Sequence, residues 1–332
     1  MYPDVQVLHI DFADYCSWAA KIPTINFYDF SISRAPKLYS TTYALSDNTS
    51  VPKVLAAFKF LLSAGVKKIL KKIKDYQPDY IISTHFLAPM VLPKNLPAPL
   101  DTVITDYHAH RIWLTPNVRN FFVATEEIKN DLEKFGVKSI VSGIPIHPKF
   151  FRHKEKDELK KQFGIDNDLP VVLLMPIKKG NITAKDAVTA IFSCNKDVNL
   201  VAVTGKNNDA TFKALEKIKN SGQKNFIILK NANNIDEWMR VADVVVSKAG
   251  GLTISECIYL QKPMVIINPI PGQEDYNADY IEKNNFGFKA NSNDELAKNI
   301  QKILYEKTGT TKKYCTSNAC EIILNEVFKT DS

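Results

Sequence analysis

The stretch VVVSKAGGLTISE, residues 244–256, contains the turn that decides the fold. Its β-branched residues are typical of a buried strand, and two glycines follow them directly before a helical segment begins. Pro263 then opens another apolar run, so that residues 243–268 predict one βαβ unit of a parallel sheet. The two glycines have no side chains, so the question is whether a ligand binds at the turn between this strand and this helix.

Two interpretations of this turn stay open from its residues alone. Gly250 and Gly251 would let a ligand approach the backbone and would allow positive φ, and a helix starting near Leu252 would present free N–H groups to a diphosphate. Alternatively, Thr253 and Glu256 stand three positions apart, which is the spacing of a capping box that explains the glutamate without a ligand.

Apolar strands alternate with helical stretches along the whole chain. Strands are expected at residues 5–12, 80–84, 101–106, 121–125, 139–143, 171–176, 199–205, 226–230, 244–250 and 264–269. This alternation predicts parallel sheets covered on both faces, and 332 residues exceed one ordinary core. The expected domains are therefore residues 1–150 and 151–308, separated by a proline-rich and charged seam, with a C-terminal helix in 309–332 that returns toward the first domain.

Composition narrows the class of protein. The chain is 45% hydrophobic, carries a net charge of +7 and has five cysteines without a CxxC pair or metal-ligand spacing, which favours a reduced, cytoplasmic protein without a metal. We expect no secretory signal, no membrane-spanning helix and no nucleic-acid partner, because no such motif or apolar run is present. The positive charge suits an anionic membrane or a phosphorylated ligand.

Polar residues cluster where strands end. Gln273, Glu274 and Asn277 follow a predicted strand and suit the hydroxyls of a sugar, although a solvated loop would look similar. His85, Asp106 and His110 follow strands of the first half and are candidates for a general base.

Residues 53–74 form a lysine-rich amphipathic helix that includes Lys67 and Lys71. Such a helix either packs its apolar stripe on a sheet, lies on an anionic membrane, or does both.

Two longer stretches resemble a known family. Residues 247–281, SKAGGLTISECIYLQKPMVIINPIPGQEDYNADYI, resemble the C-terminal domain of inverting GT-B glycosyltransferases that build membrane glycolipids, including monogalactosyldiacylglycerol synthases, processive diacylglycerol glucosyltransferases and the peptidoglycan lipid-intermediate N-acetylglucosaminyltransferase. Residues 102–151, with the motif TDYHAHRIW and the GIP turn, resemble the N-terminal domain of the diacylglycerol glucosyltransferases. The resemblance implies an α/β GT-B fold, in which two Rossmann-like domains face each other across a cleft.

The resemblance also implies a function and a site. The chain would transfer glucose or galactose, with inversion, from UDP-glucose or UDP-galactose to diacylglycerol or a glycosyldiacylglycerol at the inner face of the cell membrane, with no cofactor besides the donor. Trp113 and the helix lysines would face the acceptor and the membrane. Glu256 would hold the ribose, and the loop KNANNIDEWM would lie against uracil. The implied donor-site residues are Gly205, Lys206, Asn207, Ile235, Lys248, Gly250, Gly251, Leu252, Glu256, Gln273, Glu274 and Asn277.

The chain departs from the family in two places. It starts at a later strand than its relatives, without the glycine-rich loop that carries the favoured catalytic histidine, so its first domain is expected to lack the first strand. The loop MPIKKGNIT also replaces a second glycine-rich loop and keeps only Gly180. Three hypotheses follow: a fragment of an active transferase, an inactive relative that binds a UDP-sugar or lipid as a regulatory or partner subunit, or an active enzyme that uses His85, His110 or Asp106. A partner chain that supplies the missing loop fits the second hypothesis.

Overall fold

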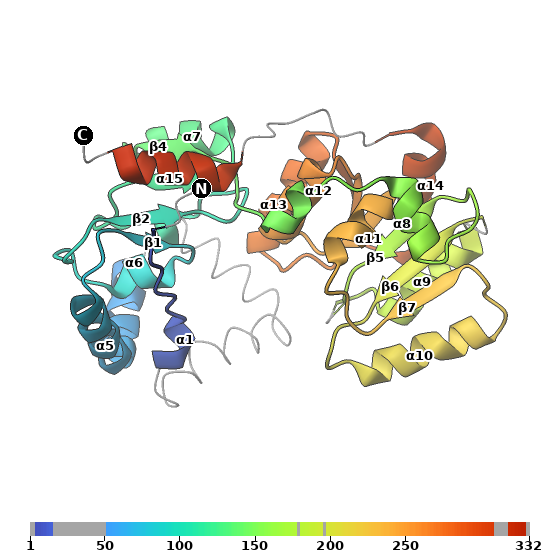
Figure 1. The fold of residues 1–332 in the computed structure, drawn as a ribbon, viewed down its shortest axis with the longest axis horizontal. Coiled ribbons are helices and arrows are strands. Elements are labelled where there is room, and N and C mark those ends of the chain that lie inside the picture. The colour runs from blue at the N-terminus through green and yellow to red at the C-terminus, as the bar shows by residue number, and fades with distance from the viewer. Residues whose placement is uncertain (1–3, 16–50, 178–179, 195–196, 309–317, 330–332) are drawn as a thin grey trace. The chain divides into compact units, whose positions relative to one another are not determined.

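The chain forms two compact units in a computed structural model that describes residues 4–15, 51–177, 180–194, 197–308 and 318–329 (Figure 1). Contacts divide it into Met1–Ile144 with Asn318–Ser332, and Pro145–Ser317. The C-terminal segment therefore belongs with the first unit. None of the helices in the described ranges is both long enough and apolar enough to cross a membrane.

The first unit contains a four-stranded parallel sheet. Its strands are β1 (Ile81–Ser83), β2 (Leu100–Val103), β3 (Phe121–Val123) and β4 (Ser139–Val141), in that order across the sheet. Its helices are α1 (Phe12–Tyr15), α5 (Val51–Tyr76), α6 (Leu87–Val91), α7 (Glu126–Glu133) and α15 (Ala319–Phe328), with the 3-10 turn η2 (Arg111–Trp113).

Helices cover this sheet on both faces, because neighbouring residues of a strand point to opposite sides. Phe121 and Val123 pack with α7. Phe122, between them, packs with Ile323 and Val327 of α15, a helix from the far end of the chain. The parallel sheet is thus the middle layer of an α/β structure, and the helices on its two faces come from distant parts of the sequence.

The expected strand at residues 5–12 is wrong. Residues 5–11 form no strand, and α1 begins at Phe12. Val7 is 83% exposed, whereas Ile10 and Phe12 pack against Ile69 and Ile73 of α5. Two apolar side chains of this segment are therefore packed against α5, and this packing does not require the segment to pair with a strand.

The second unit contains a six-stranded parallel sheet of order β10-β9-β8-β5-β6-β7. Its strands are β5 (Val171–Leu174), β6 (Asn199–Val203), β7 (Phe226–Leu229), β8 (Val244–Ser247), β9 (Met264–Ile267) and β10 (Gly287–Ala290). Its helices are α8 (Lys156–Gln162), α9 (Ala184–Cys194), α10 (Asp209–Asn220), α11 (Ile235–Val241), α12 (Gly251–Tyr259), α13 (Gln273–Lys283) and α14 (Asn293–Glu306), with the 3-10 turn η3 (Pro148–Phe151).

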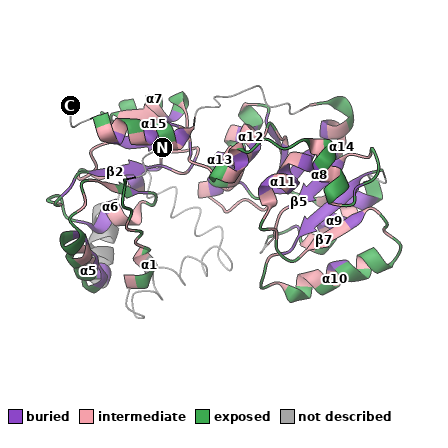
Figure 2. Ribbon diagram, viewed as in Figure 1, coloured by how far each residue is buried: buried purple, intermediate pink, exposed green. Residues whose placement is uncertain are grey.

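The order of these strands fixes where a ligand is expected. Every residue of β5, β6, β8 and β9 is buried, and Figure 2 shows the sheet as the interior of the unit with the outer side of α10 exposed. The chain leaves β5 toward β6 and β7, then returns to add β8, β9 and β10 on the other side. Ligands of such sheets bind at the carboxyl ends of the strands where the order reverses, here between β5 and β8.

Candidate functional site

The glycine turn lies at this reversal point, between the end of β8 and the start of α12. Gly250 is the N-cap of α12 with φ −72° and ψ 132°, and no side chain caps the helix. The expectation of positive φ at Gly250 and Gly251 is wrong, since the first is extended and the second is helical. The first N–H groups of α12 therefore have no side-chain cap, and anion binding at this helix start stays a prediction.

Packing within the chain does not require glycine at position 250. A Cβ there would lie 3.7 Å from Nζ of Lys248 and 3.8 Å from a carboxylate oxygen of Glu274, both ordinary contact distances. Neither backbone strain nor a clash with the described residues therefore requires glycine at this position.

Glu256 does not belong to a capping box. α12 begins at Gly251, so Thr253 is its third residue and not its N-cap, and the capping interpretation of the glutamate is wrong. The pKa of Glu256 is raised from 4.5 to about 7, chiefly by burial, while the charge of Lys149 lowers it and that of Asp236 raises it. A half-buried carboxyl group without a cap to explain it is the kind of residue that marks a binding site.

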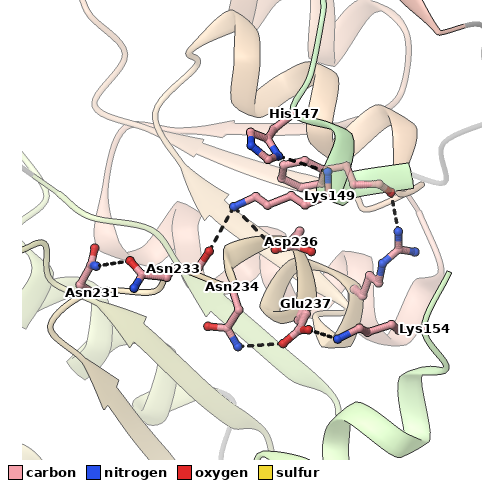
Figure 3. Close-up of polar contacts among 10 residues, drawn as sticks. His147, Lys149, Lys154, Asn231, Asn233, Asn234, Asp236 and Glu237 are labelled. Atoms are coloured by element: carbon pink, nitrogen blue, oxygen red, sulfur yellow. Dashed lines mark hydrogen bonds and ion pairs between the residues drawn. The ribbon is translucent and has the colours of Figure 1, made fainter. Parts of the chain in front are cut away.

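A polar cluster from η3 and α11 (Figure 3) contains Lys149 and Asp236, the two charged residues that act on Glu256. Nζ of Lys149 donates to the carbonyl oxygen of Asn233 (3.3 Å) and lies 3.6 Å from Oδ1 of Asp236. Lys154 pairs with Glu237, and this ion pair fastens the segment after η3 to α11. These contacts fix the loop 231–234 and the start of α11 at Ile235, the segment that the resemblance places at uracil.

Sequence reasoning missed Lys149. It lies in the proline-rich seam, where its charge looks like one of many solvated lysines. Only the packing of η3 on α11 and α12 reveals its position, including the edge contact between Phe151 and Tyr259 with ring centroids 5.0 Å apart.

The residues expected at the donor sugar lie on α13, against the glycine turn. Nδ2 of Asn277 donates to the carbonyl oxygen of Ala249 (3.0 Å), and Asn277 is completely buried. Glu274 is also buried and pairs with Lys248. Gln273, the first residue of α13, is half-buried. The structure thus gives Glu274 and Asn277 contacts within the chain that hold the turn in place.

The loops after β5 and β6 complete this edge of the sheet. Gly205 has φ 92°, and a Cβ on it would lie 3.9 Å from Cβ of Pro176. The next two residues of the loop, Lys206 and Asn207, are exposed. Gly180 packs on Asn268, whose side chain exchanges two hydrogen bonds with the backbone of Ile182 (3.1 and 2.7 Å). The glycine retained in the replaced loop is therefore explained by packing.

The candidate bases of the first unit differ in exposure. His110 is completely buried, and its Nδ1 accepts a hydrogen bond from the backbone N–H of Ile112 (3.0 Å), so it caps η2. His85 is exposed and stacks on Phe86 with ring centroids 4.3 Å apart. Burial of its surroundings lowers the pKa of His85, against the opposing charge of Asp11. Of the three candidate bases His85, Asp106 and His110, His85 is the exposed one.

Other candidates of the first unit have structural positions. Asp106 is 6% exposed, and Trp113 is 4% exposed beside Phe86. The ring of Trp113 packs in the core with residues of the sheet, and its expected place at the acceptor and the membrane stays a prediction. Lys67 and Lys71 are exposed on α5.

No group of three metal-ligating side chains occurs among the residues that the structure describes.

Two family models match the chain, one over each half. Residues 2–146 match the model for monogalactosyldiacylglycerol (MGDG) synthase, and residues 177–325 match the glycosyltransferase family 28 C-terminal domain. A processive diacylglycerol beta-glucosyltransferase from Staphylococcus epidermidis is 32% identical over 274 residues, covering 76% of this chain and 69% of the relative. The chain belongs to this family. The enzyme of the same name from Bacillus licheniformis is 28% identical over 286 residues, covering 82% and 74% of the two chains.

Solved structures agree on the fold. UDP-GlcNAc 2-epimerase from Neisseria meningitidis, bound to UDP-GlcNAc, has a TM-score of 0.60 at 15% identity and covers 82% of each chain. MurG from Acinetobacter baumannii has a TM-score of 0.56 at 12% identity, covering 80% of this chain and 78% of that chain. At these identities the likeness concerns the fold alone, and it confirms the expected GT-B class with two Rossmann-like units.

Proposed function

We propose that this member of the family is an inverting hexosyltransferase, which moves glucose or galactose from a UDP-sugar to diacylglycerol or a glycosyldiacylglycerol. The observation that carries the proposal is the uncapped start of α12 at the reversal point of the second sheet, next to the half-buried Glu256. The acceptor is proposed from the diacylglycerol glucosyltransferases, which the chain matches over both halves.

Each part of a UDP-sugar would meet a different group of this site. N–H groups of α12 and the Lys248 ammonium would meet the diphosphate, which gains charge as the sugar leaves. The Glu256 carboxylate would accept hydrogen bonds from the ribose hydroxyls. The loop before Ile235 would lie against uracil, and Gln273 would meet the sugar, as the resemblance implies.

Inversion requires one displacement at the sugar and one base for the acceptor hydroxyl. His85 is the base proposed here, because it is exposed and its pKa is lowered, so that the ring is neutral at pH 7. His110 is a weaker candidate, since it is completely buried.

The acceptor would reach this chain from a membrane surface. Lys67, Lys68, Lys71 and Lys74 are exposed on α5, while Ile69 and Ile73 of the same helix pack in the core. This arrangement supports peripheral attraction to anionic lipid at about 1 kcal/mol per lysine, with the apolar stripe serving the fold.

Two measurements test the proposal. Calorimetry with UDP is expected to give binding that Glu256→Ala weakens, and an unchanged affinity would remove Glu256 from the ribose. Labelled UDP-glucose and UDP-galactose, each incubated with the chain and diacylglycerol vesicles, test turnover and identify the donor.

A second candidate function is binding of the UDP-sugar without turnover, as a regulatory or partner subunit. Two observations favour it. His110 is buried and caps η2, and in the altered loop Gly180 packs against the side chain of Asn268. UDP binding without any glycolipid product would support this candidate against the enzyme.

A further inference from the structure

An ion pair lies directly against the glycine turn, and its two members come from different elements. Lys248 follows β8, and Glu274 is the second residue of α13. The lysine side chain is 53% exposed, whereas that of the glutamate is 4% exposed. The carboxylate is therefore an interior group, and the ammonium is the member of the pair that can meet a ligand.

Both carboxylate oxygens of Glu274 are used within the chain. Oε1 accepts a hydrogen bond from the Lys248 ammonium, and Oε2 accepts one from the backbone N–H of Ile270 (2.9 Å). The backbone N–H of Glu274 in turn donates to the carbonyl oxygen of Ile270 (2.9 Å). A buried carboxylate fixed at both oxygens holds a cation in one place, which an exposed lysine would not keep by itself.

The bare backbone of Gly250 leaves this pair uncovered. Among the described residues, and outside its chain neighbours, the heavy atoms within 4 Å of a Cβ built there are Nζ of Lys248 and Oε1 of Glu274. A ligand that approaches the start of α12 over Gly250 therefore meets the Lys248 ammonium at once. The ammonium has three N–H donors, so it can bond to a ligand while it stays bonded to Glu274.

We propose that Glu274 is a positioning residue: it acts through Lys248, holding the ammonium over the Gly250 turn for the diphosphate, and does not bind the donor sugar itself. The inference rests on the proposed function, because it assumes a diphosphate at α12. When the bond from the sugar carbon to the β-phosphate oxygen breaks, the electron pair stays on the diphosphate, and a cation already in place stabilises that charge without reorganising.

Calorimetric titration of the full chain with UDP and with uridine tests this role. Lys248→Met is expected to weaken UDP binding by about tenfold, the usual effect of losing a charge-assisted hydrogen bond. Glu274→Gln has one acceptor oxygen in place of two, so it is expected to weaken UDP binding by a similar factor. Uridine has no diphosphate, and its affinity should stay unchanged in both variants.

The double variant decides whether Glu274 acts through the lysine. In the Lys248→Met background, Glu274→Gln is expected to have no further effect on UDP affinity, because the cation that it positions is gone. Additive losses, a tighter UDP complex in Glu274→Gln, or a parallel loss of uridine binding would each overturn the inference. Urea unfolding checks that each variant is folded, and Glu274→Asp, which retracts the charge, replaces the glutamine variant if that does not fold.

Direct recognition of the sugar by Glu274 predicts a different result. It would leave UDP affinity unchanged and weaken only the UDP-sugar. Failure of the wild-type chain to bind UDP at all would instead remove the proposed donor site, so that the two failures are distinguishable.

Discussion

The raised pKa of Glu256 predicts that donor binding strengthens with pH. A carboxyl group with a pKa of about 7 is about one-tenth ionised at pH 6 and about nine-tenths ionised at pH 8. If the ionised form accepts hydrogen bonds from the ribose hydroxyls, the Kd for UDP-glucose should fall by about tenfold over this range. Glu256→Gln should remove this dependence.

UDP-glucose is the suitable ligand, because its esterified diphosphate does not titrate between pH 6 and pH 8. Calorimetry in buffers of different ionisation enthalpy should also detect about half a proton released on binding at pH 7. A comparison of UDP with its 2′-deoxy analogue at each pH isolates the ribose hydroxyl, since both carry the same terminal phosphate.

Stability should change in the opposite direction. The folded-state pKa of Glu256 lies above its unfolded value of 4.5, so the folded chain binds the proton more tightly, and stability falls as pH rises from 4.5 to 7. The two values correspond to about 3 kcal/mol, which Glu256→Gln should recover above pH 7 in urea unfolding. A wild-type Kd that is flat from pH 6 to pH 8, or an equal slope in the glutamine variant, would refute the reasoning.

Three further predictions concern other contacts. Lys149→Met removes the cation that lowers the pKa of Glu256, so the midpoint of donor binding should move above pH 7 in the same titration; an unchanged midpoint would contradict the cluster of Figure 3. Arg119→Met leaves Asp101 completely buried without the guanidinium that pairs with both its oxygens, and should lower the free energy of unfolding in urea by about 3–5 kcal/mol, whereas a loss below about 1 kcal/mol would show that the pair is solvated. Ile323→Ala should cost about 2–5 kcal/mol in the first unit while UDP affinity stays unchanged, and a loss of UDP binding would show that the two units are coupled.

The strands could be predicted where burial on both faces makes them continuous apolar runs. Residues 171–174 and 244–247 are such runs, and both are completely buried strands. The prediction failed at residues 5–12, whose alternation also suits a segment that packs on α5. It missed residues 287–290, because GFKA at the edge of the sheet is half exposed and contains glycine and lysine.

The candidate site could be predicted only where glycines and helix starts mark it in one segment. The turn at Gly250 was visible because strand, glycine and helix are consecutive. Lys149 and Glu274 were not assigned their positions, because their partners lie 87 and 26 residues away, at Asp236 and Lys248. Long-range packing determines which carboxylate is paired, and no local pattern records that pairing.

Glu274 and Glu256, the two glutamates near the turn, are given different roles by this long-range packing. Glu274 has a cation at one oxygen and a backbone N–H at the other, so each of its oxygens already accepts a hydrogen bond. Glu256 receives no hydrogen bond at its carboxylate from any of the described residues, and burial raises its pKa. A ligand with adjacent hydroxyl groups would supply the missing donors at Glu256, whereas the side chain of Glu274 is only 4% exposed. The same side chain therefore suits ribose recognition in one position and the placement of a lysine in the other.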